Sequence, residues 1–219
     1  MGTSLAVNDR LYKNDGSEAA DESEYRKLVG SLLYLTTTSP DITFGASFLA
    51  RFMHDPTKKH MGIAKRVLRY IQGTLDFGIE YVKGKSTILI GYYDNDWAGS
   101  EDDMRSTLGY AFNLGSGVFS WASIKQSTMT LSTAKAEYVS AAKATSQAKW
   151  LIFVLEDFGQ EHVEPLLLMC DNTLAITMAM NPVFHQKTRH ISRKFHFIRG
   201  AIQEKEIDLI YCKSEEQNG

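Results

Sequence analysis

Cysteine is scarce in this sequence: only Cys170 and Cys212 occur among the 219 residues. Two cysteines are too few for a disulfide framework, and both lie in apolar, strand-like surroundings, so we expect reduced core residues. Long apolar runs are also missing: the longest resemble Leu166–Cys170, whereas a bilayer-spanning helix needs about 20 apolar residues. Because no charged N-terminal stretch precedes an apolar one, we expect no secretory signal peptide and a cytoplasmic or nuclear location.

An excess of charge of one sign is absent as well. The 24 Lys and Arg residues nearly balance the 26 Asp and Glu residues, which leaves a formal net charge of -2 at pH 7. The chain as a whole is therefore not a typical polyanion binder, and any contact with nucleic acid must come from a local patch. Apolar residues make up 43% of the chain and charged residues 23%, a composition that excludes wholly disordered and collagen-like proteins.

The composition changes twice along the chain, and these changes predict three segments. Residues 1–24 contain a turn signal and then acidic residues with almost nothing apolar, so we expect a flexible acidic leader. Residues 25–83 carry apolar side chains at helical spacings of three and four, interrupted by Pro-containing start signals at residues 39–41 and 55–56. This pattern predicts a small helical segment with three helices.

Residues 84–219 alternate strand patterns with helix patterns. The alternation predicts an α/β fold in which helices flank a mixed sheet. Trp150, in the longest predicted helix, is expected to pack in the core. The predicted strands are Ser86–Tyr93, Leu108–Leu114, Val118–Ala122, Thr128–Leu131, Leu166–Cys170 and Ile207–Tyr211. The predicted helices are Ala136–Phe158, Asn172–Met180 and the basic helix Thr188–Glu204.

Three carboxylates occur where an α/β sheet brings strand ends and helix starts together. Asp94 follows the first of these strands, Glu137 lies in the first turn of the long helix, and Asp171 follows the strand Leu166–Cys170. Converging carboxylates repel one another unless a cation neutralises them, and Mg²⁺ prefers such oxygen ligands. Two ions about 4 Å apart stabilise both the attacking and the leaving oxygen in phosphodiester hydrolysis. The spacing alone favours the structural alternative, in which the three residues form turns and helix caps.

The strongest local basic patch runs from His185 to Arg199 and contains no acidic residue. Such a patch neutralises backbone phosphates, although a solvated helix face is the alternative interpretation. Ser106, Gln126 and Asn172 are polar residues that we consider for contact with the ribose 2′-hydroxyl, the group that distinguishes RNA from DNA. The candidates for phosphate contact are Lys187, Arg189, His190, Arg193, Lys194 and Arg199.

Seven motifs mark residues 84–219. They are G-Y-Y-D-N-D-W-A-G-S (91–100), D-M-R-S-T-L-G-Y-A-F-N-L (103–114), F-S-W-A-S-I-K-Q (119–126), L-S-T-A-K-A-E-Y (131–138), C-D-N (170–172), N-P-V-F-H-Q-K-T-R-H-I (181–191) and H-F-I-R (196–199). Taken together, they closely resemble the RNase H region of copia-type LTR retrotransposon Pol polyproteins, in the order and at the spacing of that family. The motifs Y-R-K-L-V-G-S-L-L-Y-L, S-P-D-I-T-F and K-R-V-L-R-Y-I-Q-G-T, within residues 25–74, resemble the end of the same family's reverse transcriptase.

The resemblance implies an RNase H fold and an endonuclease that hydrolyses the RNA strand of RNA–DNA hybrids by two-metal-ion catalysis. The cofactor that it implies is Mg²⁺, with Mn²⁺ as an alternative ion, and the partner that it implies is the hybrid. By motif match, Asp94, Glu137 and Asp171 are the catalytic and metal-binding carboxylates. Asp96, in the same D-x-D-W motif, is interpreted as a turn or supporting residue.

The sequence departs from the family in three places that bear on activity. Lys135 lies in the L-S-T-x-x-A-E-Y motif where family members often carry an acid, so we expect its charge to lower the local metal affinity. The Y-x-D-D motif of the family's polymerase site is absent, so we expect no polymerase activity. In the family a fourth acidic ligand follows E-E-Q, whereas here only Asn218 and Gly219 follow it. We therefore expect a C-terminally truncated RNase H-like domain with weakened activity. The alternative is a catalytically impaired, domesticated module that binds nucleic acid or an unknown protein partner.

Overall fold

The chain divides into two compact units, residues 1–79 and 80–219, whereas the sequence predicts a boundary between residues 83 and 84.

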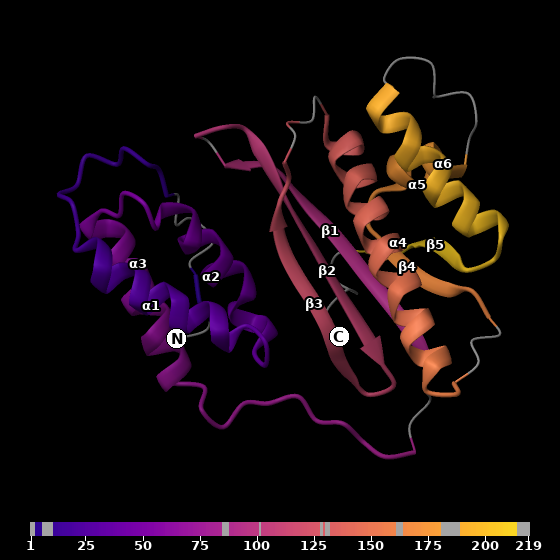
Figure 1. Ribbon diagram of the computed structural model, residues 1–219, viewed down its shortest axis with the longest axis horizontal. Coiled ribbons are helices and arrows are strands. Elements are labelled where there is room, and N and C mark those ends of the chain that lie inside the picture. The colour runs from indigo at the N-terminus through magenta and orange to yellow at the C-terminus, as the bar shows by residue number, and fades with distance from the viewer. Residues whose placement is uncertain are drawn as a thin grey trace. The chain divides into compact units, whose positions relative to one another are not determined.

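Among the described helices, none is both long and apolar enough to cross a bilayer. The computed structural model describes residues 3–5, 11–84, 88–100, 102–127, 129, 132–160, 164–180 and 189–213, with the backbone alone for residues 97–100 and 189–195 (Figure 1).

In its described residues, the first unit contains three α-helices and two short 3₁₀ turns. Its helices are α1 (Glu22–Leu35), α2 (Thr43–Leu49) and α3 (Lys58–Gln72), and its 3₁₀ turns are η1 (Pro40–Ile42) and η2 (Ala50–Phe52). The apolar stripes of the helices meet in a core that includes Tyr25, Leu32 and Val67, each 0% exposed. This unit therefore has a hydrophobic core of its own.

The beginning of the described chain differs from the expected flexible leader. Leu11 is buried in the core of the first unit. The carbonyl oxygen of Tyr12 accepts a hydrogen bond from Nε2 of His60 at 3.1 Å, and Oδ2 of Asp15 accepts one from Oγ1 of Thr57 at 2.8 Å. The acidic composition suggested solvation, but the Tyr12 carbonyl oxygen and the Asp15 carboxylate supply partners to the N-terminus of α3. The backbone of residues 18–20 also bonds to residues 56–58, so residues 11–20 pack onto the start of this helix.

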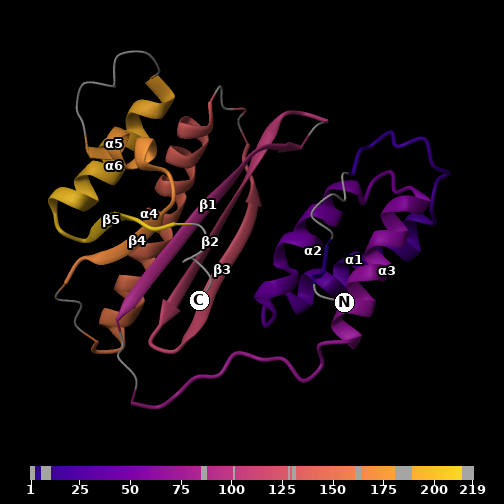
Figure 2. The same ribbon diagram turned by 180° about the vertical axis from the view of Figure 1, so that it is seen from behind.

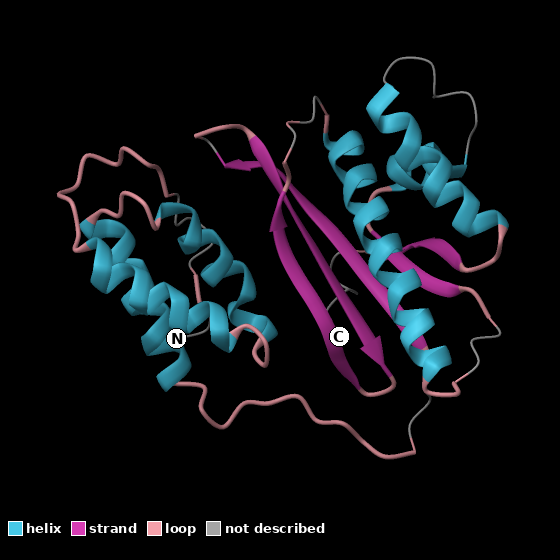
Figure 3. Ribbon diagram, viewed as in Figure 1, coloured by secondary structure: helices cyan, strands magenta, loops and turns pink. Residues whose placement is uncertain are grey.

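The second unit is built on one five-stranded sheet. The sheet order is β3-β2-β1-β4-β5, in which β1 pairs antiparallel with β2, β2 pairs antiparallel with β3, and β4 pairs parallel with β1 and β5. Figure 3 shows these strands as a single layer with the helices of the unit alongside. The mixed sheet flanked by helices confirms the predicted fold class. Its strands are β1 (Leu89–Ser100), β2 (Arg105–Leu114), β3 (Gly117–Lys125), β4 (Leu166–Cys170) and β5 (Ile207–Tyr211).

Three helices cover the sheet: α4 (Thr133–Asp157), α5 (Thr173–Met180) and α6 (Arg189–Gln203). The long helix α4 packs against β1, β2 and β4 and also contacts α5 and α6, an arrangement that can be followed from both sides in Figures 1 and 2. The core between the layers contains large side chains that are almost completely buried. They include Tyr93, Phe112, Tyr138, Leu168 and Ile198.

Gly91 explains how tightly the central strand packs. A Cβ atom at this position of β1 would lie 2.5 Å from Cδ2 of Leu168 and 2.6 Å from Cε1 of Phe112. Both distances are well below a van der Waals contact, so only glycine lets the core side chains of β4 and β2 approach this closely.

Two predicted boundaries near the carboxylates are wrong. β1 continues past Tyr93 to Ser100, because pairing with β2 supplies backbone partners beyond the apolar run, so Asp94 lies within the strand rather than after it. α4 begins at Thr133, where the side chain of Ser132 accepts the hydrogen bond of the Lys135 amide at 3.4 Å. Glu137 therefore lies in the second turn of the helix and not in the first.

Other predictions have mixed outcomes. β4 and β5 begin and end at the predicted residues, whereas the predicted strand Thr128–Leu131 lies outside the described residues except for Met129. Trp150 is 56% exposed, because Ala148, Leu151 and Ile152 form the side of α4 that faces the core. Of the two cysteines, which form no disulfide, Cys170 is buried as expected and Cys212 is half-buried.

Candidate metal centre

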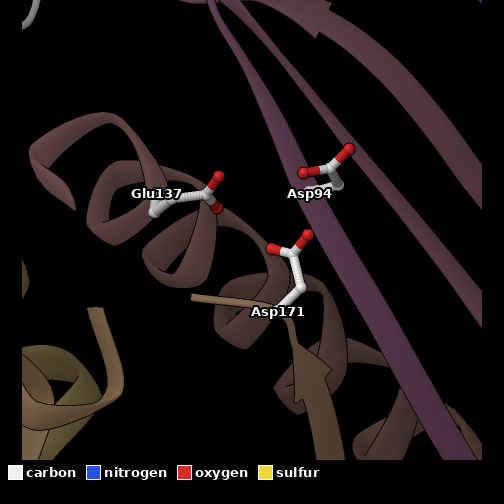
Figure 4. Close-up of side chains that lie close together, drawn as sticks. All are labelled: Asp94, Glu137 and Asp171. Carbon is white, nitrogen blue, oxygen red and sulfur yellow. The ribbon is translucent and has the colours of Figure 1, made fainter. Parts of the chain in front are cut away.

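Three carboxylates from different elements converge in the second unit. Asp94 comes from β1, Glu137 from α4, and Asp171 from the residue that follows β4. Figure 4 shows their carboxyl groups pointing toward one another. Each offers one ligand oxygen, and these oxygens all lie within 4.8 Å of one another. We call these three residues the acidic cluster.

The strand register explains why two of these residues meet. β1 and β4 are parallel neighbours, and their last paired residues are Tyr92 and Met169. Asp94 and Asp171 each follow this pair by two residues, so they extend from the same end of adjacent strands. The sequence predicts this convergence from the strand pattern, and the structure places the two carboxylates accordingly.

Burial differs among the three carboxylates. Asp94 is exposed and Asp171 is half-buried, whereas Glu137 is only 3% exposed. Among the described residues, no hydrogen-bond donor contacts Oε2 of Glu137, although this oxygen is buried. A buried carboxylate oxygen without a partner is costly, so a bound proton or a positively charged ligand would stabilise it.

The pKa values of the acidic cluster agree with the lack of a partner for the buried Glu137 oxygen. Burial raises the pKa of Glu137 to about 8, and the neighbouring charges of Asp94 and Asp171 contribute to this increase. The backbone N–H of Asn95 acts in the opposite direction. The pKa of Asp94 is also raised, first by desolvation and then by the charge of Asp171, although the Asn95 N–H donates to its Oδ1 at 2.6 Å. Like charges in a partly dry site therefore disfavour full ionisation without a cation.

The structural alternative for these residues loses its basis in this fold. Asp94 is paired with Gly109 inside a strand and is not in a turn. The favourable effect of the helix dipole on a carboxylate is confined to the first turn of a helix, and Glu137 lies beyond the first turn of α4. The cap of α5 is Asn172, whose Oδ1 accepts from the Ala175 amide at 3.1 Å. The chemistry of the donor set, which is three carboxylates and no nitrogen or sulfur, fits a hard divalent cation.

The predicted contacts to the ribose 2′-hydroxyl are placed differently from the acidic cluster. Ser106 is 0% exposed and Gln126 is 4% exposed, so both lie in the interior. Asn172 is half-buried and uses its side chain as the cap of α5. The side chains of Ser106 and Gln126 are therefore not at the surface, and the side chain of Asn172 is hydrogen-bonded within the N-terminus of α5.

The predicted phosphate-binding residues belong to the segment around α6. Arg199 lies on α6 and is half-buried. Lys187 lies outside the described residues. The backbone positions of the remaining candidates are part of α6, whereas their side chains lie outside the description. These remaining candidates are Arg189, His190, Arg193 and Lys194.

Two buried polar residues beside the cluster were not predicted from the sequence. Asn95 is 7% exposed and Ser140 is 1% exposed. Alternate residues of a strand point to the same face, so the pattern that buries Tyr93 also points Asn95 inward. This signal predicts the burial of Asn95 only if β1 is known to continue past Asp94.

Comparisons with known proteins agree with the motifs. No family model matches the chain. The Pol polyprotein of transposon RE2 from Arabidopsis thaliana is 39% identical to it over 217 residues, which cover 99% of this chain and 15% of the relative. The Pol polyprotein of transposon TNT 1-94 from Nicotiana tabacum is 34% identical over 197 residues, which cover 88% of this chain and 14% of that relative.

The chain belongs to the retrotransposon Pol family. The resemblance predicted from the motifs is thereby confirmed. The chain spans about 15% of the length of the curated Pol polyprotein from transposon RE2.

A solved structure supports the fold. The foamy viral protease-reverse transcriptase, in complex with an RNA/DNA hybrid, aligns with 91% of this chain at a TM-score of 0.52 and 10% identity, covering 25% of that chain. At this identity, the similarity concerns the fold alone. Together with the strand order and the long helix against the central strand, it agrees with the RNase H-like fold of the second unit.

Proposed function

We propose that this Pol segment is a divalent-metal-dependent nuclease of the ribonuclease H type, which hydrolyses the RNA strand of RNA–DNA hybrids. The observation that carries the proposal is the acidic cluster, with its buried and unpartnered Glu137 oxygen, on an RNase H-like sheet. A structural ion pair does not explain this arrangement, since all three members carry the same charge. Membership of the Pol family supports the choice of a nucleic-acid substrate.

Asp94, Glu137 and Asp171 are the residues that would hold the ions, and Mg²⁺ or Mn²⁺ fits their oxygen ligands. When bound, such ions activate a water molecule and stabilise the charge that develops at a scissile phosphate. Glu137 approaches from the buried side, where water competes little for its charge. Asp94 is exposed, so a substrate can approach it from solvent.

The basic segment that includes α6 is the proposed contact for the substrate backbone. Lys187, Arg189, His190, Arg193, Lys194 and Arg199 supply positive charge for phosphates. The complex of the similar foamy viral enzyme with an RNA/DNA hybrid supports this class of substrate. The affinity is expected to fall as the salt concentration rises, because each phosphate contact releases counterions.

Cleavage of a labelled RNA–DNA hybrid tests the proposal directly. The wild type is incubated with Mg²⁺ and, separately, with Mn²⁺, beside single-stranded RNA and duplex DNA as substrate controls. Glu137→Gln keeps the size of the side chain and removes its charge. Asp208→Asn is the matched control, because Asp208 is an exposed carboxylate on β5 of the same sheet.

We expect cleavage of the RNA strand by the wild type and by Asp208→Asn, and none by Glu137→Gln. Cleavage that survives in Glu137→Gln would reject the acidic cluster as the active site. Hybrid binding without cleavage in either metal, by a folded protein, would reject the nuclease and favour the alternative, a binding module with an impaired site.

A further inference from the structure

A second group of polar side chains is buried beside the acidic cluster. Asn95 lies on β1, Gln126 follows the last residue of β3, and Ser140 lies on α4. Their side chains are 7%, 4% and 1% exposed, respectively. We call these three residues the polar cluster, which joins three elements that are distant in sequence.

Hydrogen bonds connect the members of the polar cluster to each other and to the backbone of α4. Nε2 of Gln126 donates to Oδ1 of Asn95 at 2.8 Å and to the carbonyl oxygen of Ala136 at 3.1 Å, and lies 3.4 Å from Oγ of Ser140. The Ser140 hydroxyl lies 3.2 Å from Oδ1 of Asn95 and 3.1 Å from the Ala136 carbonyl oxygen, and can donate to either. One amide group therefore ties β1 to α4.

The hydrogen bonds of the polar cluster involve residues that are adjacent in sequence to two members of the acidic cluster. Asn95 is the residue after Asp94, and its backbone N–H donates to Oδ1 of Asp94 at 2.6 Å. Ala136 is the residue before Glu137, and its carbonyl oxygen accepts from Gln126. The bonds made by Gln126 therefore bridge the backbone segments that carry the two carboxylates.

Stability alone is a poor explanation for the polar cluster. Within the part of the chain that the structure describes, Nδ2 of Asn95 and Oε1 of Gln126 are buried without a hydrogen-bond partner. Replacing an incompletely bonded buried group by an apolar one is often neutral or stabilising. A function other than stability accounts for polar side chains at this place.

We propose that Gln126 and Ser140 are positioning residues that set the separation of Asp94 and Glu137. This inference rests on the proposed metal-dependent function. Carboxylates that repel one another move apart unless the elements that carry them are held together, and the polar cluster holds β1 and α4 at that point. Residues that orient metal ligands typically affect metal affinity or activity by about 10- to 100-fold.

The test removes the polar groups with little change in shape. Ser140→Ala deletes one hydroxyl, and Gln126→Met replaces the amide by an apolar group of similar length. Thr145→Val is the matched control, because Thr145 lies on α4, is 0% exposed, and has a buried hydroxyl without a partner among the described residues. The measurements are Mn²⁺ affinity by calorimetric titration, kcat and KM for the hybrid, and the melting temperature without metal.

We expect Mn²⁺ affinity and kcat of Ser140→Ala and Gln126→Met to fall about 10-fold, with KM unchanged. Thr145→Val should retain the wild-type metal affinity and kinetic constants. Without metal, the melting temperature of Ser140→Ala should lie within a few degrees of that of the wild type. A role in stability alone would lower the melting temperature and leave metal affinity unchanged.

Each contrary result has a distinct meaning. If the wild type binds Mn²⁺ and both variants bind it as tightly as Thr145→Val, the positioning role is overturned and the proposed function stands. If both variants unfold where Thr145→Val folds, the polar cluster is a stabilising element and the inference is also overturned. If the wild type neither binds Mn²⁺ nor cleaves the hybrid, the proposed function fails and this inference fails with it.

Discussion

The two units each hold a group of polar side chains around a titratable residue, and the two groups behave in opposite ways. In the first unit, Asp15, Thr57 and His60 form what we call the capping cluster at the start of α3. His60 is 0% exposed, yet both ring nitrogens have partners: Nδ1 accepts from the Thr57 amide at 3.0 Å and Nε2 donates to Tyr12. In the acidic cluster, buried Glu137 has an oxygen without a described partner.

The pKa values of the two clusters shift in opposite directions. For Asp15, burial raises the pKa, but hydrogen bonds from Ser17 and Thr57 and the nearby His60 outweigh it and lower the value to about 2. For Glu137, burial and like charges act together and raise the pKa to about 8. A cluster that supplies its own partners stabilises the fold, whereas one that concentrates like charge favours the uptake of a proton or a cation.

The largest expected effect is a pH dependence of the second unit without metal. The folded-state pKa of Glu137 is raised, so its stabilising contribution is complete below about pH 4.5 and is lost as pH rises toward about 8. The loss amounts to at most about 5 kcal/mol, at 1.36 kcal/mol for each pKa unit. Urea unfolding in EDTA, followed by tryptophan fluorescence, measures it, because all three tryptophans lie in residues 80–219.

Glu137→Gln is the control for this pH dependence. The variant should show little change in stability between pH 5 and 8, and Mg²⁺ should restore stability to the wild type at pH 8 but not to the variant. If the free energy of unfolding of the metal-free wild type did not change between pH 5 and 8, the contrast between the two clusters would be removed.

The second effect concerns catalysis. Glu137→Gln should lower the rate of hybrid cleavage by about 10²- to 10³-fold, the usual range for loss of one preorganised electrostatic group. Single-turnover kinetics measures this loss. The same variant should melt at a higher temperature than the metal-free wild type, because it removes the repulsion with Asp94 and Asp171. A variant that is both inactive and less stable would indicate a structural role instead.

The third effect breaks the capping cluster. His60→Ala removes a buried ring that stacks on Phe52 at 4.1 Å and both of its hydrogen bonds. We expect a destabilisation of the first unit by about 3 kcal/mol, as for other large-to-small core substitutions. Hydrogen exchange of the α3 amides reports it. His54→Ala is the control, because the His54 side chain is 99% exposed; equal exchange in both variants would contradict the prediction.

The smallest effect concerns the capping carboxylate. Asp15→Asn weakens the bonds from Ser17 and Thr57 and should destabilise the first unit by about 1 kcal/mol at neutral pH. The lowered pKa of Asp15 gives a contribution that is present above about 3.8 and lost as pH falls toward 2. Hydrogen exchange at pH 6 and pH 3 measures this loss, with exposed Asp55→Asn as the control. A larger difference at pH 3 than at pH 6 would show the sign to be wrong.

The sequence predicted the elements whose pattern is local. The limits of β4 and β5 follow from short apolar runs, and the mixed sheet follows from the order of strands and helices. The limit of β1 was missed because its continuation through Asp94 depends on pairing with β2. The packing of Tyr12 and Asp15 was missed for the same reason, since their partners His60 and Thr57 lie more than 40 residues away at the start of α3.

The residues of the candidate site also divide into those that the sequence predicts and those that depend on tertiary packing. The motifs placed Asp94, Glu137 and Asp171 at strand ends and a helix start, which is sufficient to propose that they meet. Ser106 and Gln126 were considered for substrate contact because they are polar and lie near motifs. Their burial could not be seen from the sequence, because it is produced by packing between sheet and helix.

By itself, the sequence determined the membership of the retrotransposon Pol family, the α/β order of the second unit and the identity of the three carboxylates. These properties are carried by residue types and by spacings within a few turns or strands. Only the tertiary structure decided that Glu137 is buried with one carboxylate oxygen that has no described partner, and that Gln126 bridges β1 and α4. Such properties arise when residues from distant parts of the chain exclude water from one another, and no local pattern encodes that exclusion.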